Sequence, residues 1–265
     1  MIAAILLTLA QATATTPAPA APSTLADARL ELCVDKARTD PASAISDASE
    51  WLYGVSTEDG SFPQQCLGMA YTALLRWDAA ERAFLAAREG APEAAHFRRA
   101  QLAAMAGNAA LAEGRGAAAL AALDLAAGDA QASGDTALQA ITQIDRARAL
   151  VLQGDTTQAG AALASARSLN PQSPYAWLLS ATLSRRLGNL EEAQAQIETA
   201  AALAPDYPET GLEAGVIAML RGNETAATQS WRSVTRLEPN GDAAIAARGY
   251  LEQLGETASE AAASR

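Results

Sequence analysis

Few residues of this sequence combine the type and the spacing that catalysis requires. The chain of 265 residues contains one histidine, His96, in the segment AAHFRR, and a Cys–His or Ser–His pair would depend on it. The glycines of GRGAAAL, which begins at Gly114, lack the Lys-Ser/Thr of a phosphate-binding loop. Adjacent carboxylates such as Glu191 and Glu192 are typical of a solvated helix face. We therefore expect that the chain is not an enzyme and binds no cofactor and no metal ion.

The charge of the chain argues against a polyanionic partner. The formal net charge is −11, and the lysines and arginines form no block that would offset it. A chain of this charge repels phosphate backbones and anionic lipids. We therefore expect no nucleic-acid partner, and we interpret the acidity as a means of keeping the surface soluble.

The N-terminus has the pattern of an export signal. Residues 2–10 (IAAILLTLA) form an apolar run that is too short to span a bilayer, and the following AQATA offers small residues for cleavage. We expect a signal peptide at 1–14, a Pro/Ala/Thr linker at 15–24 and a soluble periplasmic chain without stable membrane insertion after cleavage. The first charged side chain is Asp27, so the signal lacks a basic start. The alternative is an uncleaved N-terminus that anchors the chain in the inner membrane.

The composition indicates an all-α protein. Half of the residues are apolar, many of these are alanine, and aromatic residues make up only 5%. Alanine is the best helix former and has little surface to bury, so this composition suits many thin, close-packed helices. Alternating β-branched runs are absent, which leaves strands without a candidate.

A repeat with a fixed period organises the second half of the sequence. Gly154, Gly188 and Gly222 are spaced 34 residues apart, and each precedes Asp or Asn. Each is followed five residues later by alanine and seventeen residues later by proline: Ala159, Ala193 and Ala227, then Pro171, Pro205 and Pro239. The glycine suits a helix end, the alanine a close approach of two helices, and the proline the start of the next helix. The period therefore predicts stacked pairs of helices.

This pattern resembles the tetratricopeptide repeat family, in which each unit of about 34 residues is a pair of antiparallel helices. The strongest match lies in residues 61–94, where the signature positions are Leu67, Gly68, Tyr71, Trp77, Ala80, Phe84, Ala87 and Pro92. The resemblance implies an α-solenoid of stacked helical hairpins over residues 25–255. The expected units are 25–60, 61–94, 95–134, 135–173, 174–207 and 208–241, with a capping helix at 242–255 and a disordered tail at 256–265. About six residues are inserted in the second helix of unit 95–134 or its loop.

The two cysteines, Cys33 and Cys66, are 33 residues apart, which is close to one repeat. Both fall in the first helices of adjacent units, and facing positions on neighbouring helices can reach the Cα separation of a disulfide. An exported chain enters an oxidising compartment. We therefore predict a disulfide between them, and the alternative is a pair of buried free thiols.

The resemblance implies a concave surface lined by the first helices, which in this family bind peptides or partner helices. The candidate binding residues are Met69, Asn108, Arg148, Tyr175, Leu178 and Arg185. Arg148 and Arg185 can pair with an acidic segment or with acids of the chain itself. The apolar set Leu212, Val216 and Met219 is either part of this surface or covered by the terminal helix.

The sequence thus predicts a non-catalytic scaffold or adaptor of the bacterial cell envelope that binds a peptide or protein partner, whose identity the repeat signature does not encode. Two alternatives remain open. One is a regulatory or accessory subunit of an envelope enzyme or assembly machine, and the other is a self-assembling structural protein.

Overall fold

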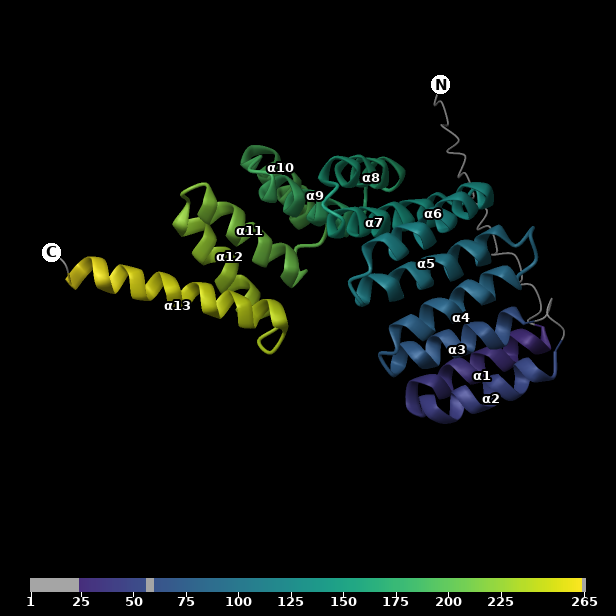
Figure 1. Cartoon of the computed structure of the whole chain (residues 1–265). Helices are drawn as coiled ribbons and strands as arrows, with labels where there is room; N and C mark the ends of the chain where they lie inside the picture. Colours follow the sequence, from purple (N-terminus) through teal and green to yellow (C-terminus); the bar gives the residue numbers. More distant parts are fainter. Residues whose placement is uncertain (1–23, 56–59, 264–265) are drawn as a thin grey trace, which may run out of the picture.

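The computed structural model describes residues 24–55 and 60–263, and all regular structure in this part of the chain is α-helix (Figure 1). The helices are α1 Leu25–Thr39, α2 Pro41–Tyr53, α3 Ser61–Ala73, α4 Trp77–Glu89, α5 His96–Ala112, α6 Gly116–Ser133, α7 Thr136–Leu152, α8 Thr156–Leu169, α9 Pro174–Arg186, α10 Leu190–Leu203, α11 Pro208–Leu220, α12 Glu224–Leu237 and α13 Asp242–Ala263. The expected signal peptide and the linker up to residue 23 lie outside the described residues.

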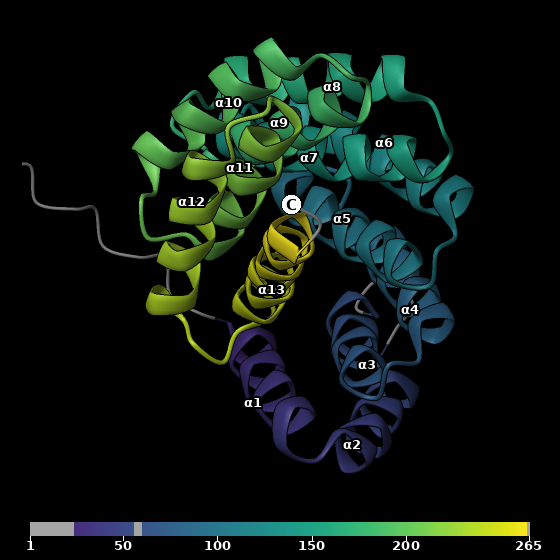
Figure 2. The same ribbon diagram turned by 90° about the vertical axis from the view of Figure 1, so that its left-hand side faces the viewer.

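Successive helices pair into hairpins, and the hairpins stack into a superhelix that curls into an open ring (Figure 2). The first helices α5, α7, α9 and α11 lie on the inner side of the ring, and the second helices α6, α8 and α10 lie on the outer side. The all-α solenoid predicted from the sequence is confirmed. Each expected unit from 61–94 onward contains one helical pair, and α13 follows the last pair.

A glycine facing a large side chain sets the distance between the two helices of a hairpin. A methyl group on Gly68 of α3 would lie 2.5 Å from ring carbons of Phe84 on α4, and Gly107 faces Leu123 in the same way. Gly215 of α11 faces the indole of Trp231 on α12. Because the large partner is buried in each case, the glycine leaves the space that the partner fills.

The turn between paired helices requires a left-handed residue. Gly154, Gly188 and Gly222 have φ values of 81°, 81° and 78°, as their place in the repeat predicts. The carboxylate of Asp155 then accepts a hydrogen bond from the backbone N–H of Gln158, which caps α8 and lowers the pKa of Asp155.

The alanines of the repeat are buried where the helices meet, since Ala159, Ala193 and Ala227 have no exposed surface. The prolines do not open the next helix as predicted. Pro171 and Pro205 lie in the connections, and α9 and α11 instead begin with the later prolines Pro174 and Pro208. A proline at the first helical position loses no hydrogen bond, so these later residues suit that place.

Two lengths differ from the prediction. The insertion expected in the second helix or loop of unit 95–134 lengthens α6 to 18 residues and also α7 to 17, while the connection between them is only Gly134 and Asp135. The terminal helix α13 has 22 residues and continues to Ala263. The expectation of a disordered tail from residue 256 is therefore wrong for residues 256–263. The segment ETASEAAA contains strong helix formers and no proline, so nothing in it ends the helix.

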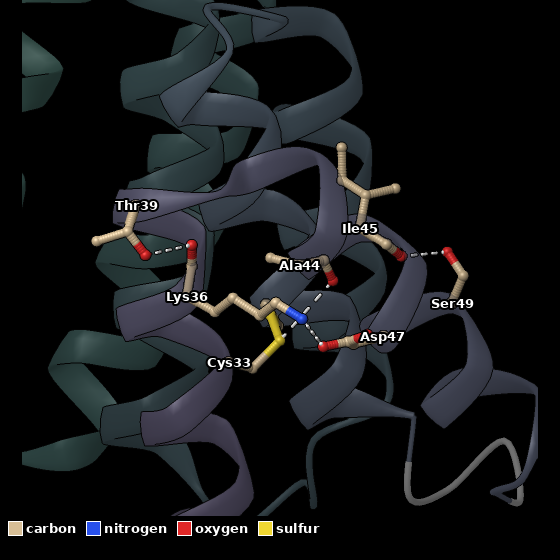
Figure 3. Close-up of a disulfide and its surroundings, with 8 residues drawn as sticks. Cys33, Lys36, Thr39, Ala44, Ile45, Asp47 and Ser49 are labelled. Atoms are coloured by element: carbon tan, nitrogen blue, oxygen red, sulfur yellow. Dashed lines mark hydrogen bonds and ion pairs between the residues drawn. A yellow bond between two sulfur atoms is a disulfide. The ribbon is translucent and has the colours of Figure 1, made fainter.

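A disulfide joins Cys33 of α1 to Cys66 of α3, with 6.0 Å between the Cα atoms (Figure 3). Both residues are buried, together with Ala48 of α2 and Leu67 of α3. Beside the bridge, Lys36 of α1 donates a hydrogen bond to Asp47 of α2 at 2.5 Å. The bridge therefore ties the first hairpin to the second across their shared core.

Four stacked side chains reinforce the same junction. Arg29 of α1 lies 4.4 Å from the ring centroid of Trp51, the ring of Trp51 stacks on Phe62 at 6.5 Å, and Arg98 of α5 lies 4.0 Å from the ring of Phe62. Burial lowers the pKa of Arg98, and the nearby carboxylate of Asp27 opposes that shift. This stack links α1, α2, α3 and α5 through cation–π and aromatic contacts.

Replacing Gly68 with alanine should destabilise the protein even though alanine is the better helix former. The added methyl group collides with Phe84, and overpacking of this kind costs about 1 to 3 kcal/mol. The matched control is Gly128→Ala in α6, where a methyl group meets nothing within 4 Å and should stabilise by up to about 1 kcal/mol. Urea unfolding followed by circular dichroism measures both. Equal effects of the two variants would contradict the close approach.

Removing the disulfide should loosen the N-terminal hairpin selectively. The double variant Cys33→Ala/Cys66→Ala should lose about 3 kcal/mol, because the bridge closes a loop of 33 residues. Hydrogen exchange should speed up mainly in α1 and α2. Reductant should bring the natural protein to the stability of the variant and leave the variant unchanged. Two free thiols in non-reducing mass spectrometry would disprove the bridge.

Candidate functional site

The residues predicted to bind a partner lie on the first helices of their hairpins, α3, α5, α7 and α9. Tyr175 on α9 is 38% exposed, and Arg148 on α7 is also exposed. Met69 on α3 is half-buried and packs against two clusters, one shared by the first and second hairpins and one shared by the second and third. Leu178 on α9 was predicted in this set but is only 6% exposed, because it packs against Ile197 and Ile217. The prediction for Leu178 is therefore corrected from groove to core.

Between α5 and α7, the predicted residues Asn108 and Arg148 belong to one hydrogen-bonded network. Arg148 Nη1 donates to Asn108 Oδ1 at 2.9 Å and to Asp145 Oδ1 at 2.9 Å. Asn108 Nδ2 donates to the other oxygen of Asp145 at 2.8 Å. The network holds α5 and α7 together and fixes Arg148 at the surface, while its remaining N–H groups have no bond to the described residues.

Between α9 and α11, Arg185 is committed to an internal ion pair. Its Nε and Nη2 atoms donate to the two carboxylate oxygens of Glu213 at 2.6 and 3.3 Å. Both side chains are largely buried, at 21% and 13% exposure. This bidentate pair occupies the guanidinium of Arg185. Arg185 therefore pairs with an acid of the chain itself, which is the alternative that the sequence left open, and is not free to bind an anion.

A pocket of about 190 Å³ opens between α7 and α9. Its floor is formed by the buried side chains Ala147, Leu163 and Leu183, and Val151 and Leu179 form its half-buried walls. Arg148, Thr182 and Arg186 complete its lining, and the two arginines are the exposed members. The lining is thus mostly apolar, with one cation on each of the two helices.

Sequence reasoning missed Arg186 and Leu179. On α9 the pocket is lined by Leu179 and Arg186, whereas the prediction named the preceding residues Leu178 and Arg185. Both pairs have helical spacing, so they differ by a rotation of the helix by one residue. The acidic partner Glu213 on the next helix could have indicated that Arg185 points toward α11.

The C-terminal end of the inner face is covered by the chain itself. Leu212, Val216 and Met219 of α11 pack against a buried cluster that includes Ala244 and Ala247 of α13. Trp231 of α12 stacks on Tyr250 of α13 with 4.9 Å between ring centroids. The helix α13 therefore occupies the place of a following hairpin and leaves the surface from α3 to α9 as the candidate site.

Among the residues that the structure describes, no group of three or more His, Cys, Asp or Glu side chains is placed to hold a metal ion. None of the helices in the described ranges is long and apolar enough to cross a membrane.

The hairpin geometry agrees with a comparison of the sequence with protein families. Residues 150–212 match the tetratricopeptide repeat family model. This part of the chain, from the end of α7 into α11, therefore resembles the tetratricopeptide repeat family. A comparison with curated proteins found no match.

Solved structures with this repeat fold extend the agreement along most of the chain. PilW, described as a widely conserved type IV pilus biogenesis factor, superposes with a TM-score of 0.67 and 18% identity, over 84% of this chain and 98% of PilW. PilF of Pseudomonas aeruginosa superposes with a TM-score of 0.64 and 15% identity, over 86% and 97% of the two chains. YrrB, described as a TPR protein with an unusual peptide-binding site, gives a TM-score of 0.51 and 18% identity, over 76% and 97%. At these identities the likeness shows the fold.

The ion pair between Arg185 and Glu213 should be worth more than an exposed pair. A double-mutant cycle with Arg185→Ala and Glu213→Ala should give a coupling free energy of about 1 to 2 kcal/mol, because both groups are largely buried. The exposed pair of Asp35 and Arg38 is the control and should give less than about 0.5 kcal/mol. Urea unfolding of the single and double variants measures both. Equal coupling would mean that Arg185 remains free to bind a ligand.

Proposed function

We propose that this chain is a non-catalytic scaffold or adaptor that holds a peptide or a helix of a partner protein on the inner face between α3 and α9. The observation that carries the proposal is the pocket between α7 and α9, which combines apolar walls with two exposed arginines on a surface that α13 leaves uncovered. Pockets with a few polar groups at an otherwise apolar lining are typical of binding sites.

The placement of the reactive residues supports a non-catalytic role. Both cysteines are used in the disulfide, so neither is a free nucleophile. The single histidine, His96, begins α5, and the pocket between α7 and α9 is lined by other residues. A scaffold needs shape and charge at its inner face and no reactive group.

We further propose that the scaffold works in the bacterial cell envelope, in the periplasm. A buried disulfide is typical of proteins that fold in an oxidising compartment. The apolar run at residues 2–10, followed by small residues, supports export. The alternative of an uncleaved N-terminal anchor would place the same inner face at the inner membrane.

The fold shared with PilW supports one more specific candidate, which is an accessory role in an envelope assembly machine. PilW is a pilus biogenesis factor and has this hairpin arrangement over most of its length. An accessory subunit of this kind would also act as a protein-binding scaffold, so this candidate differs from the main proposal only in the partner. Self-association is the remaining alternative, and light scattering of the purified chain would reveal it.

The proposal predicts where a partner can be cross-linked. A photo-reactive benzoylphenylalanine in place of Tyr175, which is exposed on the inner helix α9, should trap a partner in intact cells. The matched control is the same group at Ala195, which is exposed on the outer helix α10. Mass spectrometry should then identify one partner segment joined to Tyr175 and not to Ala195. Equal trapping at both positions, or trapping only at Ala195, would contradict binding at the inner face.

A further inference from the structure

The pocket between α7 and α9 is located at a gap in the inner layer of helices. On one side of it, α5 packs against α7, and Asn108, Asp145 and Arg148 join the two helices. On the other side, α9 packs against α11, and the pair of Arg185 and Glu213 joins them. In the described part of the chain, no hydrogen bond or ion pair joins α7 to α9, and the pocket between them reaches Leu163 of the outer helix α8.

The size of the pocket suits one large side chain. A dry apolar cavity of about 150 Å³ accepts a benzene molecule, so the volume of about 190 Å³ accommodates a phenylalanine or leucine side chain. The floor of Ala147, Leu163 and Leu183 consists of side chains that are nearly inaccessible. A polar side chain inserted there would lose hydrogen bonds to water, and the apolar floor therefore selects for an apolar group.

The rim of the pocket carries one arginine on each of the two helices although the chain as a whole is acidic. Arg186 of α9 has no ion pair with any described residue. Arg148 of α7 shares one carboxylate, that of Asp145, and is bonded through Nη1 alone. Each guanidinium thus retains N–H donors that can meet a carboxylate of a ligand.

From this arrangement we propose that the pocket anchors an internal segment of a partner protein, in which one large apolar side chain has acidic residues before and after it. The apolar side chain enters the pocket, and the flanking carboxylates meet Arg148 on one side and Arg186 on the other. Because the arginines belong to two helices on opposite sides of the pocket, carboxylates on both sides of the anchor match them better than one terminal carboxylate does. This inference rests on the proposed function and specifies its ligand.

The inference can be tested with capped fluorescent peptides on the full chain. The first peptide has a central phenylalanine with glutamates on both sides, and fluorescence anisotropy should detect its binding. Replacing the phenylalanine with serine should weaken the affinity about tenfold or more, because the anchor is lost. Replacing the glutamates with lysines should abolish binding, because the rim then repels the peptide.

Variants of the chain locate the site. Arg186→Glu should weaken binding of the first peptide at least about tenfold, since one attractive pair becomes repulsive. The control Arg232→Glu makes the same change of charge on α12, at an exposed arginine outside the pocket, and should leave binding unchanged. Val151→Phe should block the pocket and weaken binding, with circular dichroism confirming that this variant folds.

The outcomes separate the inference from the proposed function. Equal loss with Arg186→Glu and Arg232→Glu would overturn the inference, because binding would then follow net charge alone. Binding only of a version that ends in a free terminal carboxylate would overturn the internal segment. Failure of every peptide, together with a partner trapped at Tyr175, would overturn the inference and leave the proposed function standing. Failure of both experiments would overturn both.

Discussion

The close approach of the two helices within a hairpin is the constraint on which the rest of the structure depends. Gly68 against Phe84 and Gly215 against Trp231 allow the backbones to come near enough for one bulky side chain to fill the space between them. With that distance set, each hairpin presents nearly the same surface to the next, and stacking follows as a regular curve. The inner face exists because the first helices lie inside this curve.

The interactions between neighbouring hairpins decide what the inner face can do. Arginines that link the first helices, such as Arg185 with Glu213, hold these helices together and are not available to a ligand. Where the link is missing, between α7 and α9, the wall opens and an arginine stays unpaired. The same residue type is therefore a structural clamp at one junction and, in our proposal, a recognition group at the next, and the neighbouring helix determines which.

The fold was predictable from the sequence because the repeat records packing directly. The spacing of Gly154, Gly188 and Gly222 fixed the hairpins, and the cysteine spacing pointed to the bridge that the structure contains. The groove was predictable only in part, because placing Leu178 or Leu179 in it depends on a small rotation of α9 that propensities do not specify. The length of α13 was not predicted either. The helix continues because no helix-ending residue follows the last repeat, and the repeat pattern carries no information beyond that point.

The disulfide makes the two ends of the solenoid unequal in stability. A stack of hairpins loses its ends most easily, since a terminal hairpin has a neighbour on one side only. The bond between α1 and α3 links the first hairpin to the second, so these two hairpins should unfold together. The opposite end is held by the packing of α13 alone, through contacts such as Trp231 on Tyr250. Thermal fraying should therefore travel from the C-terminus toward the N-terminus, so that the pocket between α7 and α9 lies closer to the end that opens first.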